Sequence, residues 1–303
     1  MARDASGALH IADTYSSRVR RIDPATGILR TVAGQRYYQP RLGDGLPAVE
    51  VYLDKPSAVA FSAAGDLLIA DSQHHRIRRV DRVTGIISTF AGAGQGMNGG
   101  NLGDGEPAAS ASLSGPQGLV VGPDGSVYIA DSGNHRVRRV TPDGVIRTVA
   151  GTGWAGHGRD DVAAVNSALN FPRGLVLGPG GALFVSDTYN HWVRRVSATG
   201  VITTVAGTGV RGCHGDDGPA TAAGLAMPNG LALGPEGSLY IADTANSRIR
   251  RVTPDGSIAT FAGTGSSGDW LREPHALLAG PGATLLVSNG GRNQVSAVAL
   301  PTS

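Results

Sequence analysis

Five prolines recur along the chain in a repeated sequence context, and a different polar residue follows each of them. Polar groups of several kinds that converge in a concavity are what a ligand-binding site uses. The sequence around each proline repeats, but the residue directly after it differs from repeat to repeat. This variation indicates either that these residues bind a ligand or that they line a hydrated surface to which no ligand binds. The prolines are Pro56, Pro116, Pro172, Pro228 and Pro274. The candidate ligand-binding residues that follow them are Ser57, Gln117, Arg173, Asn229 and His275.

The Gly-rich segments between the repeats supply four further candidates. Imidazole groups and a carboxylate together can bind a divalent metal, but these residues belong to separate repeats, and the sequence does not show that they converge. We therefore assign no metal ligand. The sequence requires no cofactor, and a divalent metal stays an open alternative. The four candidates for ligand binding are Trp154, His157, His214 and Trp270.

One complete repeat spans residues 112–151 and shows which elements must position these side chains. Short runs rich in β-branched and apolar residues alternate with turn sequences such as Pro123-Asp124-Gly125, which specify tight turns. Each run has four to seven residues, too few for a helix, so each is predicted to be a β-strand. The proline opens the first strand, where its missing N–H does not break a ladder. The unit is thus a four-stranded antiparallel sheet.

The repeat occurs six times, and its most constant feature is an acidic residue at the end of the second strand. Successive anchors are separated by 58, 60, 56, 56 and 46 residues. Such a period is typical of a repeat architecture, and four antiparallel strands repeated about an axis make a β-propeller. A Leu three residues before each proline is predicted to hold the crossover on apolar surface. The anchors are Asp13, Asp71, Asp131, Asp187, Asp243 and Asn289.

The order of strand, Asp, Asn-His-Arg turn, strand and Thr-Val-Ala-Gly resembles the NHL repeat over essentially the whole chain. Residues 127–151 show this order in full. The resemblance implies an all-β, six-bladed β-propeller with mostly four-stranded blades, and much less about activity, because propellers host many functions. We expect one propeller domain over residues 1–303, with blades near 1–34, 56–92, 116–151, 172–207, 228–263 and 274–300.

The first and last blades are predicted to be incomplete. Met1 falls just before a second strand, so no first strand is recognisable there, and the last blade ends with its third strand near Val298. Propellers normally close by sharing strands between their termini. We therefore expect the natural chain to extend upstream, as a monomeric domain of a larger, bacterial protein.

Charged residues of the repeat itself are predicted to be architectural. The Arg-x-Arg-Arg sequence of the third strand is spread over all blades, which favours pairing between blades, with the repeated Asp residues as partners, over a nucleic-acid surface. Each anchor Asp is predicted to cap its own turn through backbone N–H groups two residues on. The histidines of this turn, His75, His135 and His191, and the loop residues Asp44, Asp104, Asp160 and Asp216 receive the same structural interpretation.

Composition sets weaker bounds. The formal net charge of +2 at a pI near 8.9 disfavours an obligate polyanion binder. A single cysteine, Cys213, excludes an internal disulfide and gives no compartment. The chain shows no signal peptide and no apolar run long enough to span a membrane. Localisation is therefore left unassigned.

We predict a binding or interaction scaffold whose loop-rich channel face takes a protein, peptide, glycan or small ligand. The alternative is a propeller enzyme, a hydrolase or lyase related to metal-dependent lactonases or strictosidine-synthase-like proteins. The lyase pattern implied by resemblance needs three histidines at equivalent blade positions, and only His275 follows a proline. The lactonase pattern needs Glu, Asn and Asp ligands, and only Asn229 fits. Single-stranded RNA binding is the third alternative, which the scarcity of aromatic residues, 5% of the chain, disfavours.

Overall fold

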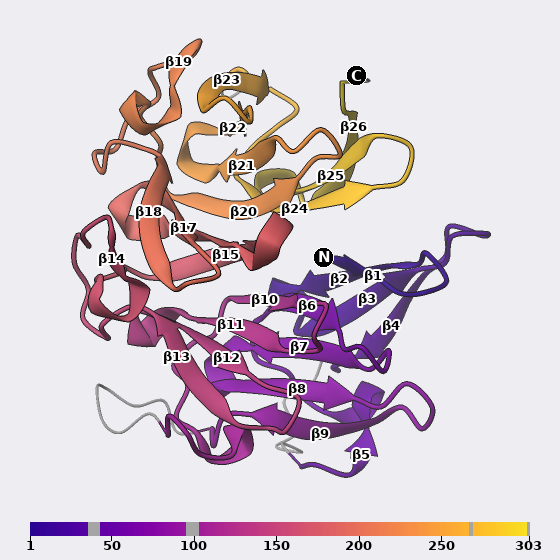
Figure 1. Ribbon diagram of the computed structural model, residues 1–303. Helices are drawn as coiled ribbons and strands as arrows, with labels where there is room; N and C mark the ends of the chain where they lie inside the picture. Colours follow the sequence, from indigo (N-terminus) through magenta and orange to yellow (C-terminus); the bar gives the residue numbers. More distant parts are fainter. Residues whose placement is uncertain (36–42, 95–102, 267–268, 302–303) are drawn as a thin grey trace. The chain divides into compact units, whose positions relative to one another are not determined.

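The computed structural model describes residues 1–35, 43–94, 103–266 and 269–301. Within these residues the chain forms six antiparallel β-sheets, the blades of a six-bladed β-propeller fold, joined by loops and 3-10 turns without an α-helix (Figure 1). Contacts divide the chain into two compact units, Met1–Val149 and Ala150–Ser303, which are described one at a time. The predicted fold class is confirmed.

The first unit contains three sheets, each an antiparallel meander. In the first, the two-residue strand β1 pairs with β2 through Ala2 and His10, so a short first strand exists where the sequence shows none. That sheet is β1 (Ala2–Arg3), β2 (Leu9–Asp13), β3 (Arg18–Ile22) and β4 (Leu29–Ala33). The second is β5 (Leu46–Pro47), β6 (Pro56–Phe61), β7 (Leu67–Asp71), β8 (Arg76–Val80) and β9 (Ile86–Ala91). The third is β10 (Gly118–Val121), β11 (Val127–Asp131), β12 (Arg136–Val140) and β13 (Ile146–Ala150).

The second unit also contains three sheets. The first is β14 (Val162–Ala163), β15 (Pro172–Leu177), β16 (Leu183–Asp187), β17 (Trp192–Val196) and β18 (Val201–Ala206). The next is β19 (Gly218–Pro219), β20 (Pro228–Leu233), β21 (Leu239–Asp243), β22 (Arg248–Val252) and β23 (Ser257–Ala262). The last has three described strands, β24 (Pro274–Gly280), β25 (Thr284–Asn289) and β26 (Gln294–Ala299).

Three sheets carry a fifth strand that the sequence pattern does not predict. The two-residue strands β5, β14 and β19 come from the Gly-rich loop before each sheet and pair with its outermost long strand, β9, β18 and β23. Their shortness explains why no period-2 pattern announces them. The loop between sheets is thereby fixed to the rim of the sheet that follows it.

Apolar side chains fill the space between adjacent sheets within each unit. In the second unit, Val193 and Ala206 of one sheet pack in a single cluster with Leu239 and Ile241 of the next. All five leucines that precede the prolines are fully buried, which confirms their predicted packing role. Repeats that share their cores in this way hold neighbouring first strands in a fixed relation.

Candidate functional site

The repeated arginine in the middle of four of the third strands belongs to the framework. In the second unit, Arg194 is completely buried, and its Nη2 donates to Asp160 Oδ1 at 2.7 Å, while Nη1 lies 3.9 Å from Asp187 Oδ2. Arg250 has the same relation to Asp216 at 2.6 Å. The predicted structural pairing of Arg with Asp is confirmed. It joins each sheet to its own rim loop, however, and not to the neighbouring blade. The other two pairs of this kind are Arg78 with Asp44 and Arg138 with Asp104.

The anchor Asp residues do not cap their own turns as predicted. No side-chain cap hydrogen bond occurs in these turns. Four of them accept a backbone N–H located 17 residues earlier instead, as Asp187 does from Asn170 at 2.6 Å. Burial raises the pKa of Asp187 to about 7, against hydrogen bonds from Asn170 and Asn190 and the charge of Arg194. The long-range bond satisfies a backbone N–H of the crossover that lies at least partly buried and would otherwise be unpaired. The four residues are Asp71, Asp131, Asp187 and Asp243.

Two of the histidines that end these turns hold the next sheet. His191 Nδ1 accepts the backbone N–H of Met227 at 3.1 Å, and His75 Nδ1 accepts that of Gly115 at 3.0 Å. Desolvation lowers the pKa of His191, with Arg211 and His157 acting in the same direction. A neutral imidazole can accept through one nitrogen, so this pKa direction fits the bond. In both pairs the acceptor lies in one sheet and the donor just before the next, as an architectural role requires.

Four of the five residues that follow the prolines lie in β-bulges of the first long strand of their sheet, and Gln117, which precedes β10, is the exception. In β15, Pro172 pairs with Asp187 while Leu175 pairs with Val185, so the chain carries one extra residue there. The strands β6, β20 and β24 show the same shift directly after their prolines. A bulge bends its strand and changes the direction of a side chain. These variable positions are therefore displaced from the regular ladder in every such blade.

In the second unit three of these residues come together. Asn229 Nδ2 lies 3.0 Å from His275 Nδ1. Arg173 is close enough to act on the pKa of His275: desolvation lowers this pKa first, the positive charge of Arg173 lowers it further, and Glu273 raises it. A Cβ on Gly174 would overlap the backbone oxygen of Asn229, which shows how closely β15 and β20 approach. We call Arg173, Asn229 and His275 the post-proline trio.

Two aromatic residues that the sequence analysis did not select complete this cluster. The rings of Phe171 and Tyr189 stack at a centroid distance of 5.1 Å. The guanidinium carbon of Arg173 lies 5.2 Å from the centroid of Phe171 and 5.6 Å from that of Tyr189. Phe171 directly precedes Pro172 and adopts a positive φ of 54°. Both residues could have been noticed in the sequence, because each places an aromatic ring at a repeat position where the other blades carry various residues.

In the first unit, the two corresponding residues contribute mainly to contacts between sheets. Ser57 Oγ lies 3.1 Å from the carbonyl oxygen of Pro116 and 3.2 Å from that of Gln117, and it accepts a hydrogen bond from Ser72 at 2.7 Å. Gln117 is half-buried and donates its backbone N–H to Ala130. The hydroxyl of Ser57 is thus already occupied by backbone of the next sheet.

The four loop candidates lie apart from the post-proline trio in their contacts. Trp154 is 75% exposed, and His157 packs edge-on against Trp192 at 4.9 Å. His214 is exposed and contacts the backbone of its own loop, and Trp270 is half-exposed. Among the described residues no group of three or more His, Cys, Asp or Glu side chains is arranged to hold a metal ion.

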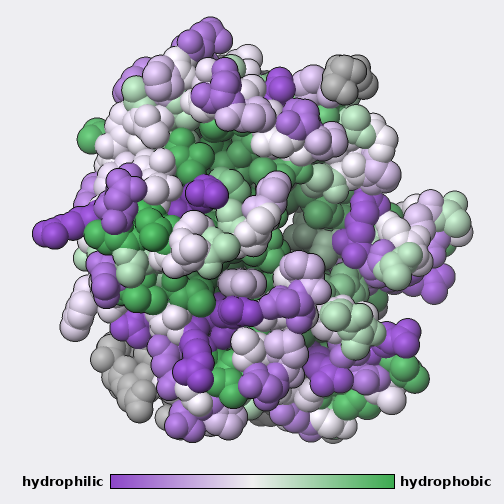
Figure 2. All heavy atoms as spheres, in the orientation of Figure 1, coloured by the Kyte–Doolittle hydropathy of each residue, from purple (hydrophilic) through white to green (hydrophobic). Residues whose placement is uncertain are grey.

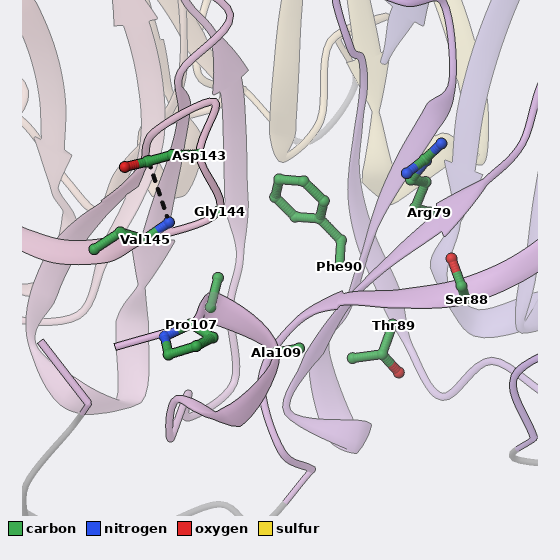
Figure 3. A pocket seen from close by; sticks show the side chains of 10 residues that line it. Arg79, Ser88, Thr89, Phe90, Pro107, Ala109, Asp143, Gly144 and Val145 are labelled. Atoms are coloured by element: carbon green, nitrogen blue, oxygen red, sulfur yellow. Dashed lines mark hydrogen bonds between the residues drawn. The ribbon is translucent and has the colours of Figure 1, made fainter. Parts of the chain in front are cut away.

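A pocket of about 360 Å³ in the first unit offers little chemistry. It lies between the second and third sheets, and Figure 3 shows the Phe90 ring pointing into it, between Arg79 and the Asp143–Val145 turn. Both charged residues are committed elsewhere: Arg79 to Asp66 at 2.7 Å and Asp143 to Thr141. On the face drawn in Figure 2, hydrophilic and hydrophobic residues are interspersed. The trio is therefore the stronger candidate site.

Comparisons with known proteins agree with the fold. The family model described as Teneurin NHL domain matches residues 44–141, 93–155 and 199–268, and the NHL repeat model matches residues 169–196. The chain is 30% identical over 80% of its length to Protein SUPPRESSOR OF QUENCHING 1, chloroplastic, of Arabidopsis thaliana, and 30% identical over 82% of its length to mouse Teneurin-4. It spans only 24% and 10% of these two relatives.

A solved structure of virginiamycin B lyase from Staphylococcus aureus is similar in fold, with a TM-score of 0.58 and 19% identity over 99% of this chain and 83% of the lyase. At this identity the likeness concerns the fold alone. None of the described helical turns is long and apolar enough to cross a membrane.

Proposed function

Since the chain belongs to the NHL-repeat family of β-propellers, we propose that it is an interaction module that binds a protein or peptide partner through the post-proline trio. The observation that carries the proposal is the convergence of Arg173, Asn229 and His275 from three adjacent bulges. The framework around them is the same in each blade, while the three side chains differ. A surface in which only the presented groups vary is suited to recognition.

The enzyme alternative receives less support from the same geometry. Asn229 and His275 bond to each other, and the third member of the trio is a cation, which cannot serve as a metal ligand. The repeated arginines that might contact RNA are buried and paired with Asp, as Arg194 and Arg250 are. A partner bound through polar side chains and the exposed Tyr189 ring fits this surface better than either alternative.

Selection of random 12-residue peptides displayed on phage against the purified chain tests the proposal. We expect enriched peptides whose affinity falls at least tenfold for Arg173→Ala and His275→Ala. Arg195→Ala is the matched control, because this arginine is exposed and belongs to the same sheet. Peptides that bind wild type and both trio variants equally would place recognition elsewhere and refute the proposal.

A further inference from the structure

The geometry points to a carboxylate as the group that the post-proline trio recognises, with Arg173 as its principal contact. This inference rests on the proposed function, because it names the chemistry of the ligand at the same site. Three observations support it. Arg173 has no charged partner among the described residues, two aromatic rings lie against its guanidinium, and neutral polar groups lie beside it.

Arg173 differs from the framework arginines of its own unit. Arg194 and Arg250 each place Nη2 within 2.7 Å of a carboxylate. Arg173 has no ion pair and no hydrogen bond with any residue in the described part of the chain; its Nε is buried without an acceptor, and its two Nη groups are not among the buried atoms. A guanidinium has five N–H donors and no way to lose its charge near neutral pH. An anionic ligand would supply the acceptors that the protein leaves out.

The aromatic pair determines how Arg173 can be approached. The guanidinium lies over the stacked rings of Phe171 and Tyr189, which attract the cation through their faces. A cation–π contact of this kind uses no oxygen acceptor, so the N–H donors of the guanidinium are left for other partners. A carboxylate matches that edge with two parallel hydrogen bonds, the bidentate arrangement that arginine favours. Because the rings restrict the side chain before binding, less conformational entropy is lost on binding.

The remaining members of the trio favour a single negative charge over several. Asn229 supplies a neutral amide, and His275 is held toward its neutral form by desolvation and by Arg173, with Glu273 opposing. Arg173 is thus the one full positive charge of the trio, and the Glu273 carboxylate, which also acts on His275, further disfavours a doubly charged ligand. A carboxylate carries one negative charge, whereas a phosphate monoester carries up to two and is usually matched by several cations or backbone N–H groups.

Benzoate, benzamide and phenylphosphonate are the probes of choice, at constant ionic strength, with the Arg173 Nε–H and His275 ring resonances followed by NMR. We expect benzoate to shift the Arg173 resonance in a saturable way and to raise the pKa of His275. Benzamide, which has the same shape without the charge, should bind at least tenfold more weakly. Equal affinity for benzamide, or tenfold tighter binding of phenylphosphonate, would overturn the assignment.

Two conservative variants separate a positioned guanidinium from a general positive charge. Arg173→Lys keeps the charge and removes the fork, so benzoate affinity should fall at least tenfold. Arg195→Lys, at an exposed arginine of the same sheet, should leave it unchanged. Equal losses in both variants would indicate nonspecific attraction and overturn the inference. Unchanged thermal unfolding of Arg173→Lys would show that the loss is not due to misfolding.

Peptides from the phage selection identify the source of the carboxylate. Each is compared as a free acid, as a C-terminal amide, and with its Asp and Glu replaced by Asn and Gln. Loss of affinity on amidation identifies a chain terminus, and loss on side-chain replacement identifies an acidic residue; affinity unaffected by both changes would overturn the inference while leaving the proposed function intact. Benzoate binding at Arg173 together with peptides that ignore the trio would refute the proposed function and leave the carboxylate assignment standing.

Discussion

Arg194 and Arg173 belong to the same sheet of the second unit, and their surroundings are opposite. Arg194 is completely buried on β17 and is held between the carboxylates of Asp160 and Asp187. Arg173 lies half-buried in the bulge of β15, beside two aromatic rings and without a carboxylate partner among the described residues. One arginine completes the protein's own network, and the other finds no acceptor for its donors among the described residues.

The difference teaches which repeat positions serve the fold and which are free for recognition. The arginine at the Arg194 position recurs in three other blades with an equivalent loop Asp, so it satisfies a requirement that these four blades share. The residue at the Arg173 position differs in each of the five blades that have it, and in four of them it lies at a bulge, which is a feature of the backbone. A repeat protein can therefore vary its binding chemistry at the bulge without altering its core.

Replacing each arginine with alanine is the strongest way to break this comparison. Arg194→Ala leaves Asp187 buried without its cation, and breaking a buried ion pair typically costs about 3–5 kcal/mol. Arg173→Ala removes no protein hydrogen bond, only the contacts with the two rings, and should cost no more than about 1 kcal/mol, as is usual for accessible cation–π contacts. Urea denaturation monitored by tryptophan fluorescence measures both. Comparable losses in the two variants would mean that Arg173 is also a framework residue.

The close approach of neighbouring innermost strands can be tested at a glycine. A Cβ at Gly174 would overlap the backbone oxygen of Asn229, and backbone cannot move aside as a flexible side chain can. Gly174→Ala should therefore cost about 1–3 kcal/mol, the usual penalty for overpacking, and should weaken ligand binding by displacing β20. Gly156→Ala is the control, since a Cβ there would meet only the Ala168 methyl at 3.5 Å. Equal stability of the two variants would show that the strands can separate freely.

Much of the fold could be predicted from the sequence because every blade repeats the same local signals. Turn sequences such as Pro-Asp-Gly and short β-branched runs fix the strands, and a buried Leu before each proline fixes the crossovers. The rim strands β5, β14 and β19 could not be predicted, because two residues carry no period. The acceptor role of Asp187 toward Asn170 was also missed, since it depends on a contact 17 residues away in sequence.

The candidate site was only partly predictable for a related reason. Variation after each proline selected Arg173, Asn229 and His275, and these three lie together. The same criterion selected Ser57, whose hydroxyl is instead used by carbonyls of the adjacent sheet. Tyr189 was not selected because its role arises from stacking beneath a side chain that is 16 residues away. Sequence variation locates a position, whereas the neighbours across blades decide its use.

The smallest expected effect on stability comes from His191, the histidine that links neighbouring sheets, and this effect depends on pH. His191 accepts the Met227 N–H through Nδ1, and desolvation lowers its pKa below the ordinary value. The native state therefore disfavours the protonated ring. The contribution of His191 to the free energy of unfolding is fully present above the pKa of the unfolded state, near 6.5. It is lost as the pH falls through the pKa of the folded state.

His191→Gly removes the acceptor while keeping a residue suited to the positive φ of 57° at this turn. At pH 8 the wild type should be more stable than the variant by about 1 kcal/mol, the usual net value of one hydrogen bond. This difference should shrink toward pH 5, because an imidazolium cannot accept the Met227 N–H. Buried Asp187, whose pKa is raised, gives stability an opposite slope, but it does so in both proteins and cancels in the difference. A difference that stays constant from pH 8 to pH 5 would assign the contribution of His191 to ring packing, and the link between the sheets would then not depend on its protonation state.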